Sequence, residues 1–243
     1  MIGLVLAAGA GKRLQPWTDT LPKTLLPVDG ERSILDVALA NLKRVGIEEV
    51  AIVTGFAAER VAERGPELER RHGLRLELVF NPRAEEWNNA YSLWCARELF
   101  REGVLLVNGD TVHPATVEER LLEARGPELV IAVDQEKPLG AEEMKVHVSG
   151  DGLLERINKN IEPSSADGEY IGLTLIEPAA ATPLAEALEA TWRRDPSLYY
   201  EDGFQEYADR GGRIGIAPSG TVEWVEVDDH ADLARAREVA CRC

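Results

Sequence analysis

Long apolar runs, basic residues and cysteines are all scarce in this chain of 243 residues. No apolar run approaches the roughly 18 residues that a membrane helix requires, so we expect no membrane-spanning segment. Lysine and arginine number 27 against 43 aspartates and glutamates, which gives a formal net charge of −16. This balance argues against nucleic acid, whose phosphates demand a basic surface. A small phosphorylated ligand is not excluded, because a few local cations can dominate one cleft of an acidic protein.

The three cysteines are Cys95, Cys241 and Cys243, an odd number with two at the tail. They favour a reducing, cytoplasmic location over a disulfide framework. With no histidine nearby, the Cys241–Cys243 pair is typical of a frayed tail rather than a metal site. The early apolar stretch LVLAAGA has no basic segment before it, so we do not expect a secretory leader. The sequence leaves open whether the protein forms a homo-oligomer.

Lysine is the rarer of the two basic residues, with only six among the 27. In a chain that prefers arginine, a retained lysine can serve as a compact point charge. Four of the six fall in stretches that carry chemical motifs: Lys12, Lys23, Lys145 and Lys159.

Apolar runs and amphipathic stretches alternate along the first half of the chain. The pattern predicts strands at 2–7, 50–54, 74–81, 104–107 and 129–133, and helices at 34–45, 57–71, 91–100 and 116–124. This alternation predicts right-handed crossovers and a mainly parallel sheet. The length suits one domain whose core needs no disulfide or metal. We therefore expect a single-domain, Rossmann-like three-layer α/β/α fold with a mainly parallel mixed sheet.

In the second half of the chain the regular alternation of predicted strands and helices ends. A Gly-Asp-Gly turn at 150–152 predicts a small β-hairpin over the carboxyl edge of the sheet, where it would extend over the active site. Further strands are predicted at 170–176, 213–217 and 222–227, with two helical stretches between the first two and a closing helix at 231–239.

The first thirty residues carry the clearest motif. The strand 2–7 ends in Ala8-Gly9-Ala10-Gly11, small residues that let backbone approach a flat or anionic ligand. A Walker loop would need glycine in place of Leu6 and serine or threonine in place of Arg13. A dinucleotide-binding fingerprint would need a small residue in place of Leu14. The pattern L-A-A-G-x-G-x-R, followed by P-K and then P-V, resembles the signature of sugar-nucleotide-type nucleotidyltransferases.

A second motif, N-N-x-Y-S-L at residues 88–93, resembles the base-binding segment of the phosphocholine cytidylyltransferase branch of that family. Amide side chains both donate and accept hydrogen bonds, as reading a pyrimidine edge requires. The same residues also suit a helix that is capped by Asn89 and buried from Tyr91 onward, and the two interpretations are compatible. The resemblance implies nucleotide contacts from Ala7, Ala8, Gly9, Gly11, Lys12, Asn81, Asn88, Asn89 and Ser92.

Two aspartates at predicted strand ends are candidate metal ligands. Asp110 follows an apolar run, and Asp228 lies near the C-terminus, with Glu226 and Asp229 as neighbouring alternatives. The resemblance implies that Asp110 and Asp228 hold Mg²⁺, an ion that prefers oxygen ligands. It also implies a catalytic set of Arg13, Lys23 and Asp110, with Arg13 on the departing pyrophosphate and Lys23 on the α-phosphate.

The resemblance further implies that residues 1–140 form mainly the nucleotide-binding half and residues 141–243 mainly the acceptor-binding half. Lys145 and Lys159 would hold the acceptor's phosphate, and aromatic side chains could cage a quaternary ammonium. A positive amine or a hydroxyl would be met by Glu169, Glu201 or Asp202. Tyr200 completes the set of acceptor residues.

The implied reaction is transfer of CMP from CTP to a small phosphorylated or phosphonate acceptor, with release of pyrophosphate. Phosphocholine, aminoethylphosphonate and inositol or other polyol phosphates all fit as acceptors. A uridylyl- or thymidylyltransferase that makes a nucleotide sugar is the nearest alternative. A non-catalytic nucleotide-binding regulatory protein is the alternative from another class.

Overall fold

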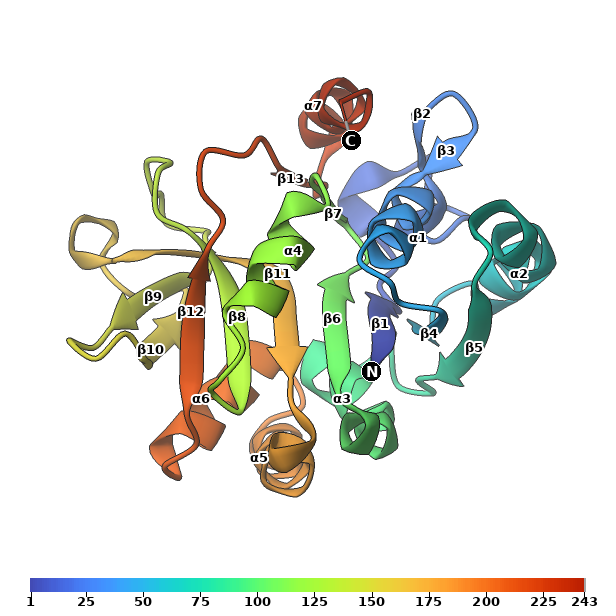
Figure 1. Cartoon of the computed structure of the whole chain (residues 1–243). Helices are drawn as coiled ribbons and strands as arrows, with labels where there is room; N and C mark the ends of the chain where they lie inside the picture. Colours follow the sequence, from blue (N-terminus) through green and yellow to red (C-terminus); the bar gives the residue numbers. More distant parts are fainter. Residues whose placement is uncertain (243) are drawn as a thin grey trace.

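A nine-stranded mixed sheet forms the centre of the computed structural model, which describes residues 1–242 (Figure 1). Its strands lie in the order β10-β9-β11-β6-β1-β4-β5, and β8 links β11 to β12. They are β1 (Ile2–Ala7), β4 (Glu49–Thr54), β5 (Arg75–Phe80), β6 (Val104–Asn108), β8 (Leu129–Asp134), β9 (Lys145–Val148), β10 (Leu154–Asn158), β11 (Gly168–Ile176) and β12 (Ile214–Pro218). Cys243, half of the cysteine pair at the tail, lies outside the described residues.

The sheet is mainly parallel, as the sequence predicts. β1 pairs in parallel with β4 and β6, β4 with β5, and β8 with β12. Only β11 among the central strands runs the other way, antiparallel to β6 and β8. Strands such as β6 and β8 are apolar along most of their length because both faces of the sheet are covered.

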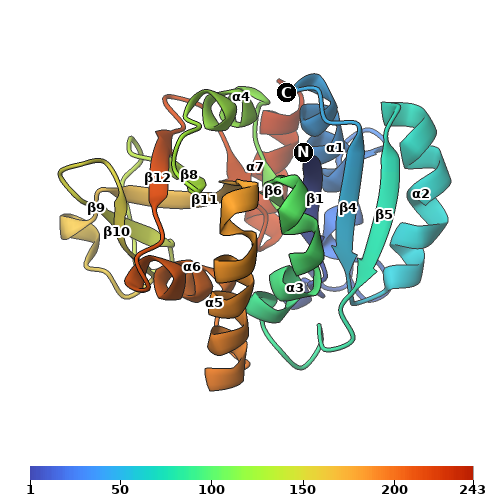
Figure 2. The same cartoon turned by 60° about the horizontal axis from the view of Figure 1, so that its bottom comes forward.

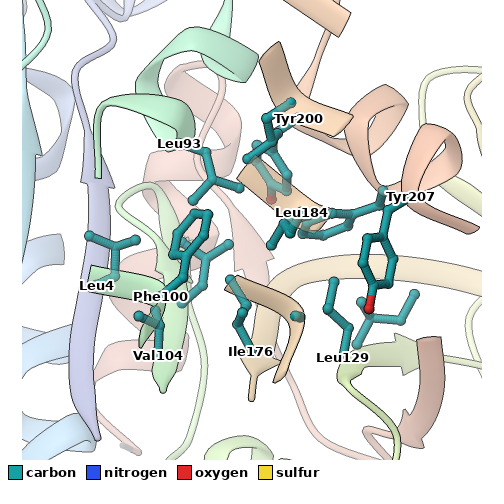
Figure 3. Close-up of a cluster of buried hydrophobic side chains, with 14 of the residues drawn as sticks. Leu4, Leu93, Phe100, Val104, Leu129, Ile176, Leu184, Tyr200 and Tyr207 are labelled. Carbon is teal, nitrogen blue, oxygen red and sulfur yellow. The ribbon is translucent and has the colours of Figure 1, made fainter. Parts of the chain in front are cut away.

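Helices cover the sheet on both faces and complete the three layers (Figures 1 and 2). Alternate residues of β1 point to opposite faces: Val5 packs under α1, α2 and α4, whereas Leu4 packs under α3, α5 and α6. Figure 3 shows this second core, where Phe100 lies next to Leu4. The helices are α1 (Ile34–Arg44), α2 (Ala58–His72), α3 (Asn89–Cys95), α4 (Thr116–Glu123), α5 (Ala181–Arg194), α6 (Tyr200–Asp209) and α7 (His230–Ala240).

A third, smaller core fixes the loop that follows β1. Leu14, Leu26 and Leu233 pack together in it, which joins the loop to α7. The loop contains 3₁₀ helices at Lys12–Leu14 and Lys23–Leu25 and leads into a short hairpin, β2 (Pro27–Asp29) and β3 (Arg32–Ser33). Arg13 and Lys23 are thus carried on short helical turns anchored by buried leucines.

The structure departs from the sequence prediction in three places. The predicted helix 91–100 is divided into α3 and a 3₁₀ helix at Arg97–Glu102. The predicted strand 222–227 shortens to β13 (Val225–Glu226), which pairs with β7 (Thr111–Val112) in a separate two-stranded sheet. The hairpin β9–β10 forms, but it continues the main sheet, because β9 pairs with β11. No helix in residues 1–242 is long and apolar enough to cross a membrane.

Candidate active site

A cavity of about 770 Å³ opens where β1 and β6 end. Its floor is the loop 8–11 together with Asn108-Gly109-Asp110. A Cβ atom on Gly109 would lie 2.5 Å from the carbonyl oxygen of Leu6, so only glycine allows the two strand ends to approach this closely. Gly11 has a φ of +58°, and a Cβ there would lie 3.0 Å from Cβ of Lys23. The predicted glycine loop is therefore packed directly against Lys23.

Four residues that are far apart in the sequence form one ionic cluster on this floor. The Lys23 Nζ atom lies 2.7 Å from Asp110 Oδ2 and 3.1 Å from Asp228 Oδ1. The Arg13 Nη2 atom lies 2.8 Å from Asp228 Oδ2. The pairing of β7 with β13 produces this arrangement, because β7 directly follows Asp110 and β13 carries Glu226 to its side.

The charged groups in this cluster shift one another's pKa values. Burial alone would lower the pKa of Lys23, but the carboxylates of Asp110 and Asp228 outweigh it and raise that pKa above its usual value. Burial would likewise raise the pKa of Asp228, but Lys23 and Arg13 hold it below its usual range. Lys23 is therefore a fixed cation and Asp228 a fixed anion at neutral pH.

Three carboxylates at this point form a group that could hold a divalent metal. One oxygen from each of Asp110, Glu226 and Asp228 can be chosen so that all three lie within 4.8 Å of one another. Asp110 Oδ1 is buried and has no hydrogen-bond partner within residues 1–242. Such an oxygen is suited to coordinate a cation. The donors are all oxygen, the type that Mg²⁺ prefers. Asp229, the other candidate from the sequence, instead caps α7 by accepting hydrogen bonds from the amides of Ala231 and Asp232.

The asparagine-rich segment lies on a different wall of the cavity, where Asn88, Asn89 and Ser92 line it. The helix forms, but Asn88 and not the expected Asn89 caps α3, by accepting from the amide of Asn89. The side-chain oxygen of Asn89 accepts from the amide of Tyr200, which leaves its NH₂ group as the donor for a ligand. Asn81 is buried behind Ser92 and donates to its hydroxyl oxygen.

The wall of the cavity that the family resemblance assigns to the acceptor carries both acidic and basic side chains. Lys159, Glu169 and Glu201 line the cavity there. Lys137 lines it too, with its Nζ atom 2.7 Å from Glu169 Oε2, and the motif analysis missed it. The one sequence feature that could have pointed to Lys137 is that it is one of only six lysines in the chain. Burial raises the pKa of Glu169 to about 7, even though Lys137 acts in the opposite direction.

Five of the expected ligand contacts do not line the cavity: Asn81, which is buried behind Ser92, and four others. Lys12 borders an adjoining hollow of about 340 Å³, next to Arg13. The hydroxyl of Tyr200 donates to the side-chain oxygen of Asn108 from within the core. Asp202 accepts from the amide of Tyr199 and caps α6. Lys145 is fully buried and does not line the cavity.

Lys145 fastens the loop that precedes its strand. Its Nζ atom donates to the carbonyl oxygens of Gly140, Ala141 and Glu143, at 3.0 to 3.1 Å. These three bonds account for its burial, since a buried ammonium needs a partner for each donor. The same loop presents Glu143 and Met144 to the cavity.

Lys145→Met is expected to destabilise the protein by about 2–4 kcal/mol, because it leaves three carbonyl oxygens without a donor. For a chain of this size this corresponds to a fall in Tm of roughly 5–15 °C. Thermal unfolding followed by circular dichroism measures it. Lys43→Met is the matched control, since Lys43 donates to the carbonyl oxygen of Gly73 at the exposed surface. An equal Tm for the two variants would show that Lys145 does not stabilise the loop.

Comparison with known proteins places the chain in a family. The profile of the MobA-like NTP transferase domain matches residues 3–199. A CMP-5′-(3-aminopropyl)phosphonate synthase of Streptomyces rubellomurinus is 33% identical over 245 residues, covering 96% of this chain and 38% of that protein. A choline-phosphate cytidylyltransferase of Streptococcus pneumoniae is 35% identical over 98 residues, 40% of each chain.

Solved structures agree on the fold. The inositol-1-phosphate CTP transferase of T. maritima superposes with a TM-score of 0.85 at 22% identity, covering 99% of this chain and 95% of that one. The aligned regions cover only about two fifths of the length of each of the two curated relatives above. The match to the family profile over most of its length shows that the chain belongs to the MobA-like NTP transferase domain family.

Proposed function

We propose that this protein transfers CMP from CTP to a small phosphorylated or phosphonate acceptor and releases pyrophosphate. The observation that carries the proposal is the ionic cluster of Arg13, Lys23, Asp110 and Asp228 beside the glycine loop. The relatives support the choice of nucleotide and acceptor, since those named above are a CMP-phosphonate synthase and a choline-phosphate cytidylyltransferase.

In the proposed reaction an acceptor oxygen attacks the α-phosphorus of CTP in line. A new P–O bond forms while the bond to the β-phosphate's bridging oxygen breaks, and pyrophosphate carries away the electron pair. A phosphate monoester has a second pKa of about 6, so the nucleophile is largely dianionic at neutral pH and needs no general base. The difficulty is to bring two polyanions together, which requires positioning and charge neutralisation.

The residues of the cluster would meet that requirement. Lys23 would neutralise the charge that gathers on the α-phosphate, and Arg13 would turn from Asp228 to the departing pyrophosphate. Asp110, Asp228 and Glu226 are the residues that would hold Mg²⁺. When bound, this ion would offset the charge of the nucleotide's phosphates. The thiols of Cys95 and Cys241 are free, and we infer a cytoplasmic location, where thiols stay reduced.

A pyrophosphate-release screen tests the proposal. The purified protein is incubated with Mg²⁺, each of CTP, UTP, dTTP, ATP and GTP, and a panel of phosphorylated and phosphonate acceptors. We expect release that requires both CTP and an acceptor. Release with UTP or dTTP and a sugar 1-phosphate would favour a nucleotide-sugar synthase instead. Binding of CTP without turnover of any acceptor would favour a regulatory protein.

Asn89→Ala is expected to weaken the preference for CTP over UTP by about 10-fold, the worth of one hydrogen bond to the base. The NH₂ group of Asn89 can donate to N3 of cytosine, whereas uracil carries a hydrogen there. Asn89→Asp keeps an oxygen for the Tyr200 amide and replaces the NH₂ donor with a charged oxygen that can only accept. The ratio of kcat/KM for the two nucleotides is measured in both variants. An unchanged ratio would refute base reading by Asn89.

A further inference from the structure

Asn108 lies at the end of β6, on the floor of the cavity. On one side β6 pairs with β1, and Leu6 is the partner of Asn108 there. On the other side β6 pairs with β11, where the pairing of Val107 with Leu173 brings Gly172 next to Asn108. Leu6, Asn108 and Gly172 all line the cavity. Asn108 therefore stands between the strand that leads into the glycine loop and the strand that carries the wall assigned to the acceptor.

Gly172 leaves room for the amide group of Asn108. Its φ is +85°, and a Cβ atom there would lie 2.7 Å from Nδ2 of Asn108. A residue with a side chain at this position would displace the amide group. The register of β11 shifts between Tyr170 and Thr174, and Gly172 lies within this irregular stretch. The strand is thus shaped to accept the side chain of Asn108.

A chain of buried hydroxyl groups holds the oxygen of this amide. The hydroxyl of Tyr200 donates to Asn108 Oδ1 at 2.9 Å and lies 3.0 Å from the hydroxyl of Tyr170. The Tyr170 hydroxyl lies in turn 2.8 Å from that of Thr174. Burial raises the pKa values of both tyrosines, so both hydroxyls keep their protons. The amide is therefore fixed with its oxygen bound in the core, which leaves its NH₂ group as a donor.

This NH₂ group is free to bind a ligand. Asn108 Nδ2 has no hydrogen-bond partner within residues 1–242 and is not among the buried atoms that lack one. Asn89 is held by the same tyrosine, because its oxygen accepts from the backbone amide of Tyr200. The remaining asparagine of the lining, Asn88, donates to the carbonyl oxygen of Ser197. One tyrosine thus orients two amides that each offer an NH₂ donor to the cavity.

We propose that the NH₂ group of Asn108 binds a phosphate or phosphonate oxygen of the acceptor, and that Tyr200 is its positioning residue. This inference rests on the proposed function and adds a binding residue to the same site. Arg13 and Lys23 serve the nucleotide's phosphates in the proposed reaction, so the acceptor's anionic group needs a donor beside them. An amide N–H donates a hydrogen bond and keeps its proton, so the attacking oxygen stays unprotonated.

Asn108→Ala removes the amide and adds no charge. We expect KM for the acceptor to rise by at least about 10-fold, the worth of a hydrogen bond to a charged group, and KM for CTP to stay within about threefold. Pyrophosphate release is measured with phosphocholine, aminoethylphosphonate and inositol 1-phosphate in turn. Asn160→Ala is the matched control, since Asn160 is exposed and does not line the cavity.

The loss should be similar for every acceptor that reacts, because the phosphate or phosphonate group is what they share. A loss confined to one acceptor would place Asn108 on another part of that molecule and contradict the inference. A rise in KM for CTP alone would place the amide on the nucleotide, which would contradict it equally.

Tyr200→Phe tests the positioning role, since it removes the hydroxyl and leaves Asn108 in place. We expect KM for the acceptor to rise by about 3- to 10-fold. The preference for CTP over UTP should not change, because the Tyr200 backbone amide still holds Asn89. A merely structural role would alter both quantities together. An unchanged KM for the acceptor would show that Tyr200 does not orient Asn108, and this variant decides the matter if Asn108→Ala does not fold.

The outcomes separate this inference from the proposed function. If the wild-type protein releases no pyrophosphate from CTP with any acceptor, the proposed function fails and the inference fails with it. If the wild-type protein reacts and folded Asn108→Ala keeps KM for every acceptor within about twofold, cytidylyl transfer stands and only the role of Asn108 is wrong.

Discussion

Lys23→Met is expected to lower kcat with CTP by at least about 100-fold, the effect of losing a charge partner in a transition state. The ammonium of Lys23 lies 2.7 Å from Asp110 and 3.1 Å from Asp228, and its side chain is only 14% exposed. Because the flanking carboxylates hold its pKa high, it stays charged across the pH range in which an enzyme assay is practical. Methionine keeps most of the apolar stem that packs against Gly11 and removes the ammonium group with its charge and hydrogen bonds.

The readout for Lys23 is single-turnover pyrophosphate release, which separates chemistry from nucleotide binding. Thermal unfolding of the same variant tests its fold, since the substitution leaves two carboxylates without their cation. Lys43→Met, far from the cavity, serves as the control for loss of one surface lysine. A folded Lys23→Met variant with turnover within about fivefold of wild type would remove Lys23 from the catalytic set.

The placement of Arg13, Lys23 and Asp110 on one cavity could be anticipated from the sequence. Apolar runs long enough to be buried strands predict a parallel sheet, and the carboxyl ends of parallel strands meet at one edge. The glycine loop after β1 and Asp110 after β6 follow directly from that rule, because β1 and β6 are neighbours. Asp228 required the family resemblance, since β13 has only two residues, too few to show any periodicity.

The acceptor wall could be predicted only in part, for physical reasons that its residues make clear. Lys145 and Lys159 both stand near the ends of the same hairpin, yet one bonds to backbone carbonyls and the other lies over Tyr199. Which partner a long flexible lysine finds depends on the path of the loop around it, and no sequence period encodes that path. Tyr200 and Glu201 are adjacent, and the helical rotation between them sends one into the core and the other to the cavity.

The carboxylates show how the site balances its charges. Lys23 and Arg13 offset the charges of Asp110 and Asp228, and burial beside these two aspartates raises the pKa of Glu226 to about 8. A nucleotide triphosphate that drew these cations to its phosphates would leave the carboxylates uncompensated. A divalent metal that arrives with the nucleotide would restore the balance, which gives a physical reason for the two to bind together.

Asp110→Asn tests that balance, because asparagine keeps the size of the side chain and removes one negative charge. We expect kcat to fall by about 100-fold or more and the Mg²⁺ concentration for half-maximal rate to rise by at least about 10-fold. The rate is measured across a Mg²⁺ titration, with Asp209→Asn on the exposed side of α6 as the control. Lys23 loses its closest partner in this variant, so raised Mg²⁺ should recover little of the rate if Asp110 also orients Lys23. Full recovery at high Mg²⁺ would limit Asp110 to metal binding, and an unchanged Mg²⁺ requirement would exclude it as a metal ligand.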